Sequence, residues 1–136
     1  MKILIVGSGG REHAVVDALA QSPEVRKIYA APGNGGICQQ SELVSIDAND
    51  LDGLARFATV ERIDLTFVGP EMPLSNGIVD VFHKRGLTIV GPTADQARLE
   101  SSKIFAKRFF KRNGIPTAEF AEASTLAEAY DVLERS

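Results

Sequence analysis

The opening of the chain constrains the fold most, because an apolar run there meets a glycine-rich turn and then a helical pattern. Residues 2–6 read KILIV, a β-branched, apolar run of the kind that forms a buried strand. The turn GSGGREH follows, and apolar side chains then recur at helical spacing at Ala14, Val15, Ala18 and Leu19. A strand, a tight turn and a helix in this order indicate one unit of a parallel sheet.

The same alternation continues as far as residue 91. Further strands are predicted at KIYAA, LVSI, IDLTFVG and LTIVG, which begin at residues 27, 43, 63 and 87. Helices between them are predicted from apolar stripes at Leu51, Leu54, Ala55 and Ala58, and at Ile78, Val79 and Phe82. We therefore expect an α/β fold with a doubly wound, mostly parallel sheet that is Rossmann-like in its connections.

The pattern changes after Gly91. Helices are predicted over residues 94–99 and 102–112, a strand at TAEFA (117–121), and a last helix with an apolar stripe at Leu126, Tyr130 and Leu133. A helix with such a stripe needs a partner that buries it. We expect that the chain stops partway through a second domain and is a fragment of a longer protein.

Composition and charge narrow the class of partner. A formal net charge of −3 offers no general attraction to nucleic acid or to an anionic membrane. The apolar run Ile3–Val6 is far shorter than the roughly 20 residues of a membrane span. Cys38 has no second cysteine to pair with, and it matches no metal-ligand spacing with His13 or His83. We expect a cytoplasmic protein with small-molecule ligands and no metal ligands of its own.

Candidate binding residues lie where the predicted strands end, since ligands of doubly wound sheets bind beyond the C-terminal ends of the strands. Three loops qualify: Gly7–His13, Pro32–Gly36 and Gly69–Gly77. In the first loop, glycines allow close approach of the backbone and the start of a helix attracts an anion, so Gly9, Gly10 and Arg11 form a candidate phosphate cradle. The alternative is a turn that needs glycine only for packing.

A dinucleotide site is disfavoured. Gly7 and Gly9 fit the pattern G-x-G-x-x-G, but the third glycine is replaced by Glu12, whose carboxylate should repel a pyrophosphate. The second strand ends at Pro32, where a dinucleotide fold carries an acidic residue for the ribose. A dinucleotide-binding oxidoreductase domain and a non-catalytic binding module of the same fold stay as the alternative functions.

Two further side chains are candidates. Glu71 lies between prolines at a strand end in VGPEMPLSNG, where its carboxylate can accept hydrogen bonds from sugar hydroxyls; alternatively it serves the dipole of the next helix. Lys103 lies in the first turn of a predicted helix, where the dipole disfavours a cation, and this misplacement suggests a ligand.

Five stretches, in order and at matching spacing, resemble the phosphoribosylamine-glycine ligase family: VGSGGREHA, APGN, VGPEMPLSNGIVDVF, GPTADQARLESSKIFAKRF and GIPTAEF. The resemblance covers nearly the whole chain. It implies an ATP-grasp enzyme of purine synthesis, which joins glycine to 5-phosphoribosylamine and gives glycinamide ribonucleotide, ADP and phosphate. Residues 1–100 would be the pre-ATP-grasp, substrate-binding domain, and residues 101–136 the start of the ATP-grasp domain.

The resemblance also implies roles for particular residues. The single phosphate of the substrate would lie on the Gly9–Arg11 turn, its ribose hydroxyls would contact Glu71 and Asn34, and Glu12 would face the sugar. Lys103 resembles an ATP-contacting lysine of the family. ATP and Mg²⁺, with Mn²⁺ as the alternative ion, would be bound mainly by the part of the protein beyond residue 136, so the chain holds no catalytic residue and should be inactive alone.

Overall fold

The computed structural model of the chain describes residues 1–135, and its centre is a five-stranded sheet with the order β3-β2-β1-β4-β5. Every strand pair in it is parallel. The strands are β1 (Lys2–Gly7), β2 (Lys27–Pro32), β3 (Glu42–Leu43), β4 (Leu65–Val68) and β5 (Ile89–Val90). The predicted α/β fold with a parallel sheet is confirmed.

Most helices lie where the apolar stripes predict them, whereas the short helices directly after β2 and β4 were not predicted. The α-helices are α1 (Gly10–Ala20), α2 (Leu51–Glu61), α3 (Glu71–Ser75), α4 (Ile78–Lys84), α5 (Ala94–Ser101), α6 (Lys103–Arg112) and α7 (Leu126–Glu134), with a short 3-10 helix η1 (Ile37–Gln39) after β2. In α2, the side chain of Asp50 caps the first turn by accepting the Gly53 N–H at 2.9 Å.

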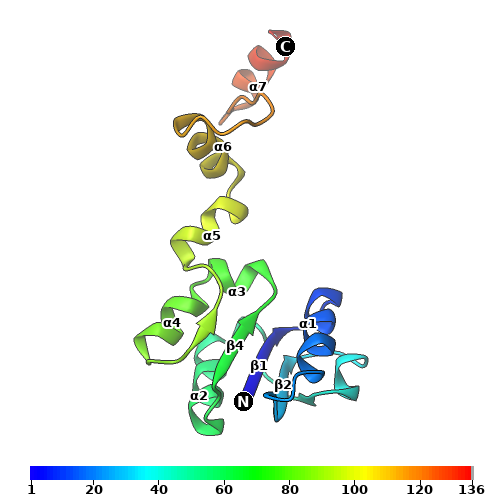
Figure 1. The fold of residues 1–136 in the computed structure, drawn as a ribbon. Coiled ribbons are helices and arrows are strands. Elements are labelled where there is room, and N and C mark those ends of the chain that lie inside the picture. The colour runs from blue at the N-terminus through cyan, green and yellow to red at the C-terminus, as the bar shows by residue number, and fades with distance from the viewer. Residues whose placement is uncertain (136) are drawn as a thin grey trace. The chain divides into compact units, whose positions relative to one another are not determined.

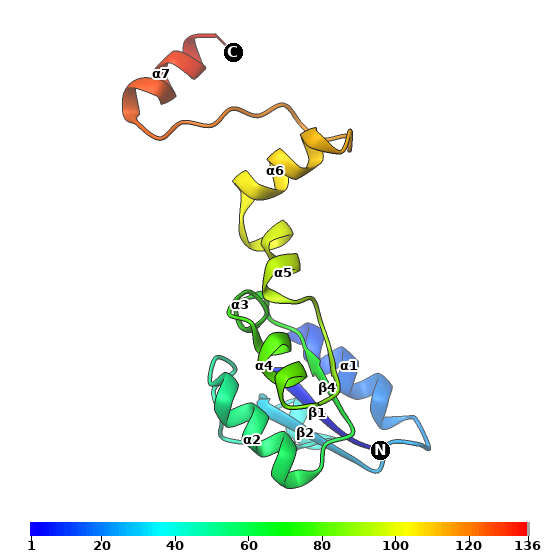
Figure 2. The same ribbon diagram turned by 90° about the vertical axis from the view of Figure 1, so that its left-hand side faces the viewer.

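Strand β1 lies at the centre of the sheet and is buried on both faces. Successive side chains of a strand point to opposite faces. Ile3 and Ile5 pack with Val16 of α1, whereas Leu4 and Val6 pack in a cluster with residues of α2 and α4. Figures 1 and 2 show α1 on one side of the sheet and α2 and α4 on the other. This two-sided burial explains why KILIV is apolar throughout rather than alternating.

Three predicted strands differ in the structure, and of these LTIVG contributes only Ile89–Val90 to β5. LVSI contributes only Leu43 to β3: Val44 still donates its N–H to Ala30 O at 2.9 Å, and the chain then leaves the sheet. TAEFA is not a strand, because no other segment within residues 1–135 pairs with it. A strand needs a neighbour to accept and donate its backbone hydrogen bonds, and a β-like composition alone does not supply one.

The described residues form two compact units, Met1–Ala97 and a second that begins at Arg98. In the second unit, Lys107 Nζ on α6 donates to Thr117 Oγ1 at 2.7 Å and to Ala118 O at 3.0 Å, which holds the following segment against α6. The predicted apolar stripe of α7 is exposed, with Leu126 at 73%, Tyr130 at 60% and Leu133 at 70%.

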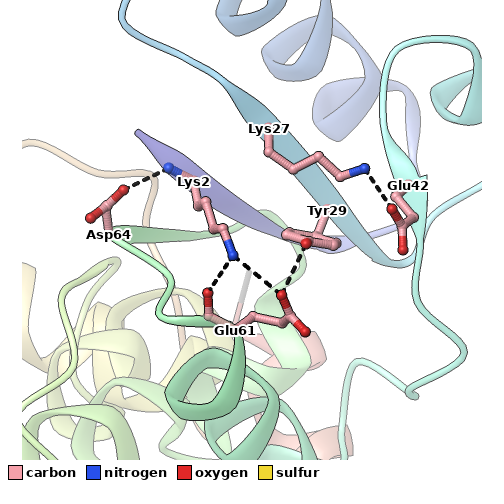
Figure 3. A network of polar contacts seen from close by, with 6 residues as sticks. All are labelled: Lys2, Lys27, Tyr29, Glu42, Glu61 and Asp64. Atoms are coloured by element: carbon pink, nitrogen blue, oxygen red, sulfur yellow. Dashed lines mark hydrogen bonds and ion pairs between the residues drawn. The ribbon is translucent and has the colours of Figure 1, made fainter.

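A polar network joins α2 to the edge of the sheet where β1 and β2 begin (Figure 3). Tyr29 Oη donates to Glu61 Oε2 at 3.0 Å, and Lys2 Nζ donates to the Glu61 backbone oxygen at 2.8 Å. The Lys2 N–H donates to Asp64 Oδ2 at 2.6 Å. This edge is therefore closed by contacts within the protein, while the opposite edge, where the strands end, carries the loops with candidate site residues.

Replacement of Tyr29 by Phe should lower the free energy of unfolding by about 1 kcal/mol at neutral pH, because it removes one partly buried hydrogen bond to Glu61. Burial, and then the hydrogen bond to Glu61, raise the pKa of Tyr29. A raised pKa stabilises the folded chain below about pH 10, and that contribution is lost as the pH rises through the folded-state value. The Phe variant should lack this alkaline loss in urea unfolding experiments.

Tyr130→Phe is the matched control, since Tyr130 is 60% exposed on α7. It should leave both the stability and its alkaline pH dependence unchanged. Equal effects of the two substitutions would contradict a stabilising role for the Tyr29–Glu61 bond.

Candidate functional site

The turn after β1 presents the start of α1. β1 ends at Gly7, whose φ of 130° is a backbone conformation that favours glycine. Gly9 is the N-cap of α1 and has no side-chain oxygen to cap it; instead Glu12 in the first turn accepts the Gly9 N–H at 2.5 Å. Gly10 and Arg11 are the first helical residues. Backbone N–H groups at this end of a helix point outward and favour an anion.

The loop after β2 is attached to this turn through Asn34. Its Nδ2 donates to Ser8 O at 2.7 Å, and its Oδ1 accepts the N–H groups of Gly36 and Ile37 at 2.8 and 3.0 Å. The Gly33 N–H also donates to Gly7 O at 3.0 Å. Asn34 thus holds its own loop in shape and ties it to the first turn.

The loop after β4 reaches the same turn through an ion pair. Glu71 is the first residue of α3, after Pro70, and its Oε1 lies 2.9 Å from Arg11 Nη2. Both side chains are exposed, Arg11 at 69% and Glu71 at 48%. The hydrogen bond from Arg11, with a smaller contribution from the Glu71 N–H, lowers the pKa of the Glu71 carboxyl. The pair offers a guanidinium and an ionised carboxylate to a ligand on the surface.

Glu12 lies beneath the turn rather than on its surface. The residue is only 3% exposed, and its side chain packs against the backbone at Gly7, Gly9 and Gly69. Its Oε1 is buried and has no hydrogen-bond partner among the described residues. The sequence suggests that Glu12 faces a sugar, but in this structure its carboxylate is covered by the turn.

The predicted site residues of the first unit gather at one edge of the sheet. Gly9, Gly10 and Arg11 lie in one turn, and Asn34 and Glu71 reach it from the loops after β2 and β4. This arrangement joins hydrogen-bond donors, a cation and a carboxylate, which is the chemistry that recognises a phosphorylated sugar.

Lys103 lies in the second unit, and Gly69 follows β4 in the first. Lys103 is the first residue of α6 in the second unit, where Ser102 Oγ caps the helix by accepting the Phe105 N–H at 3.3 Å. The sequence analysis gave Gly69 only as the first residue of a candidate loop, whereas in the structure its lack of a side chain makes room for Glu12. Its signal is register: Val6 pairs with Val68, so Gly7 at the end of β1 and Gly69 directly after β4 occupy matching positions.

Neither a metal cluster nor a membrane-spanning helix is found within residues 1–135. No group of three or more His, Cys, Asp or Glu side chains in that range could hold a metal ion. No helix in the same range is long and apolar enough to cross a membrane.

Comparison with known proteins gives consistent matches. Residues 1–100 match the family described as phosphoribosylglycinamide synthetase, N domain. The phosphoribosylamine–glycine ligase of Ralstonia nicotianae is 50% identical over 135 residues, which are 99% of this chain and 32% of that protein. The chain thus spans about a third of the length of the curated relatives that it matches.

Solved structures agree with this result. The crystal structure of phosphoribosylamine–glycine ligase from Thermotoga maritima matches with a TM-score of 0.74 and 28% identity over 99% of this chain and 30% of that one. The biotin carboxylase domain of Hydrogenobacter thermophilus 2-oxoglutarate carboxylase, crystallised with MgADP, ADP and bicarbonate, matches at 0.77 with 15% identity, over 98% of this chain and 32% of that one. The second likeness shows the fold alone. The family match and the ligase relatives together establish that this chain belongs to the phosphoribosylglycinamide synthetase N-domain family.

Proposed function

We propose that the chain is the N-terminal part of an ATP-dependent ligase that joins glycine to 5-phosphoribosylamine. The products would be glycinamide ribonucleotide, ADP and phosphate, in de novo purine synthesis. Residues 1–100 would be the domain that holds the phosphoribosyl substrate, and residues 101–136 would begin the ATP-grasp domain. Family membership and the ligase relatives support this proposal.

One observation carries the substrate assignment: three loops meet through the Asn34–Ser8 bond and the Arg11–Glu71 ion pair. A phosphoribosyl group has one phosphate, which suits Arg11 and the start of α1. Its hydroxyl groups can donate to the Glu71 carboxylate, which is ionised at neutral pH. The site therefore matches the two ends of one small ligand.

The proposed role of this domain is orientation. The carboxylate of glycine is a poor electrophile, so the reaction needs phosphoryl transfer from ATP before the amine can attack. Holding the amine of the bound phosphoribosylamine against the activated carboxyl converts a bimolecular step into one within a complex. No residue of the first unit is assigned a covalent or proton-transfer step.

ATP and Mg²⁺ are proposed to bind mainly to the part of the protein beyond residue 136. Lys103, the first residue of α6, is the ATP contact proposed within this chain. The carboxylase crystallised with MgADP shares the fold with this chain, and its ligand is consistent with nucleotide use by the same architecture. A cytoplasmic location follows from the same proposal and stays a prediction.

Titration calorimetry on the full-length protein tests the substrate assignment. Glycinamide ribonucleotide, the stable product, should bind, and Glu71→Ala should weaken binding about tenfold or more, because it removes a charged hydrogen-bond acceptor for the ribose. Glu24→Ala is the control, since Glu24 is an exposed carboxylate before β2. Binding of NADH in place of the ribonucleotide would contradict the assignment and favour an oxidoreductase domain.

The Arg11–Glu71 pair makes a separate prediction about pH. The pKa of the Glu71 carboxyl is lowered in the folded protein, so the ion pair contributes stability at any pH above the ordinary pKa of a glutamate. That contribution is lost as the pH falls through the folded-state pKa of Glu71. Arg11→Gln should therefore move the Glu71 titration midpoint to higher pH in a carboxyl-carbon NMR titration. The Glu122 midpoint, which Arg108 lowers in the second unit, should stay constant in the same spectra. An unchanged Glu71 midpoint would show that the two residues do not pair in solution.

A further inference from the structure

Glu12 is the one buried carboxylate near the candidate site, and its surroundings are unusual. Three glycines from two segments line its side chain: Gly7 and Gly9 beside β1, and Gly69 after β4. A Cβ at Gly7 would lie 2.8 Å from Glu12 Cγ, and one at Gly9 would lie 2.7 Å from Glu12 Oε2. A Cβ at Gly69 would overlap Oε1. The three glycines therefore provide the space for one side chain.

This packing reverses the roles in a dinucleotide-binding turn. There, the third glycine lies on the helix and lets it approach the strand closely. Here, the helix carries Glu12 at that position, and the glycines that permit the contact lie at the ends of β1 and β4. The glycines that resemble a nucleotide motif are thus used to house a carboxylate.

The carboxylate also takes one donor away from any ligand. Glu12 Oε2 accepts the Gly9 N–H at 2.5 Å, so this N–H already has a partner. The outward N–H groups that follow it belong to Gly10 and Arg11. An anion on this turn would be bound from Gly10 onward, and the orientation of Gly10 would depend on how Gly9 is held.

We infer that Glu12 is a positioning residue: through Gly9 it sets the conformation of the turn that binds the substrate phosphate, without touching the substrate. This inference rests on the proposed function. Glu12 is 3% exposed, which argues against direct contact, and Oε1 is buried without a partner in the described residues. A buried, half-satisfied carboxylate is costly, so a role in shaping the turn accounts for its presence better than stability does.

The test separates the phosphate from the rest of the ligand. Calorimetry on the full-length protein compares glycinamide ribonucleotide with the riboside that lacks the phosphate. The Kd of the riboside divided by the Kd of the ribonucleotide measures what the phosphate contributes to binding. Glu12→Ala should reduce this ratio about tenfold, with less than about a threefold change for the riboside. Glu12→Gln keeps an oxygen that accepts the Gly9 N–H and should restore the ratio to within about threefold of the original protein.

Thr66→Val is the control, because Thr66 in β4 is also buried, at 1% exposed, with a hydroxyl that lacks a partner among the described residues. It should leave the ratio unchanged. If Glu12→Ala does not fold, Glu12→Asp replaces it, since the shorter side chain withdraws the carboxylate from Gly9. The amide proton shift of Gly9 in NMR spectra should move in the Ala or Asp variant and much less in the Gln variant.

Two results would overturn the inference alone. Equal losses for the ribonucleotide and the riboside would show that Glu12 only supports the fold, and tighter ribonucleotide binding in both the Ala and Gln variants would show that it acts as a repelling charge. A different result, no preference of the unaltered protein for the ribonucleotide over the riboside, would overturn the phosphate assignment itself and the inference with it.

Discussion

Burial of β1 on both faces is the constraint on which the rest of the structure depends. Its side chains from Ile3 to Val6 are at most 1% exposed, and removing any such side chain from water contributes roughly 1.5–3 kcal/mol. Covering both faces requires α1 on one side and α2 with α4 on the other. Crossover connections that place helices on both faces join parallel strands, in agreement with the parallel pairing of every strand pair in the sheet.

Parallel pairing also decides where function can lie. All strands end at one edge, so three loops that are distant in the sequence meet there, and the helix that follows β1 begins there as well. The opposite edge is closed by Lys2, Tyr29 and Glu61, whose contacts stabilise the fold without involving the candidate site. Stability and ligand binding are thus assigned to opposite ends of the same strands, which allows each to be altered by substitution with limited effect on the other.

The sequence predicted the parts of the structure that depend on local pattern. The strands at KILIV and KIYAA and the stripe of α2 are each determined by residues within one segment. The predictions of strands at TAEFA and at the end of LVSI were wrong, because a strand exists only where a partner lies beside it. The pairing of Arg11 with Glu71 depends on β1 and β4 being neighbours, and the burial of Glu12 depends on a glycine at position 69, so neither is visible in the residues around them.

Glu12 also shows why a glycine pattern is ambiguous evidence for a ligand. Glycine is required wherever another group approaches the backbone closely, and that group can be a phosphate or a side chain of the same protein. At Gly7 and Gly69 the group is the Glu12 side chain. At Gly10 nothing lies within 4 Å of a Cβ position, so packing within the protein does not explain this glycine. Among the glycines of this turn, Gly10 is therefore the one that contacts within the described residues do not account for.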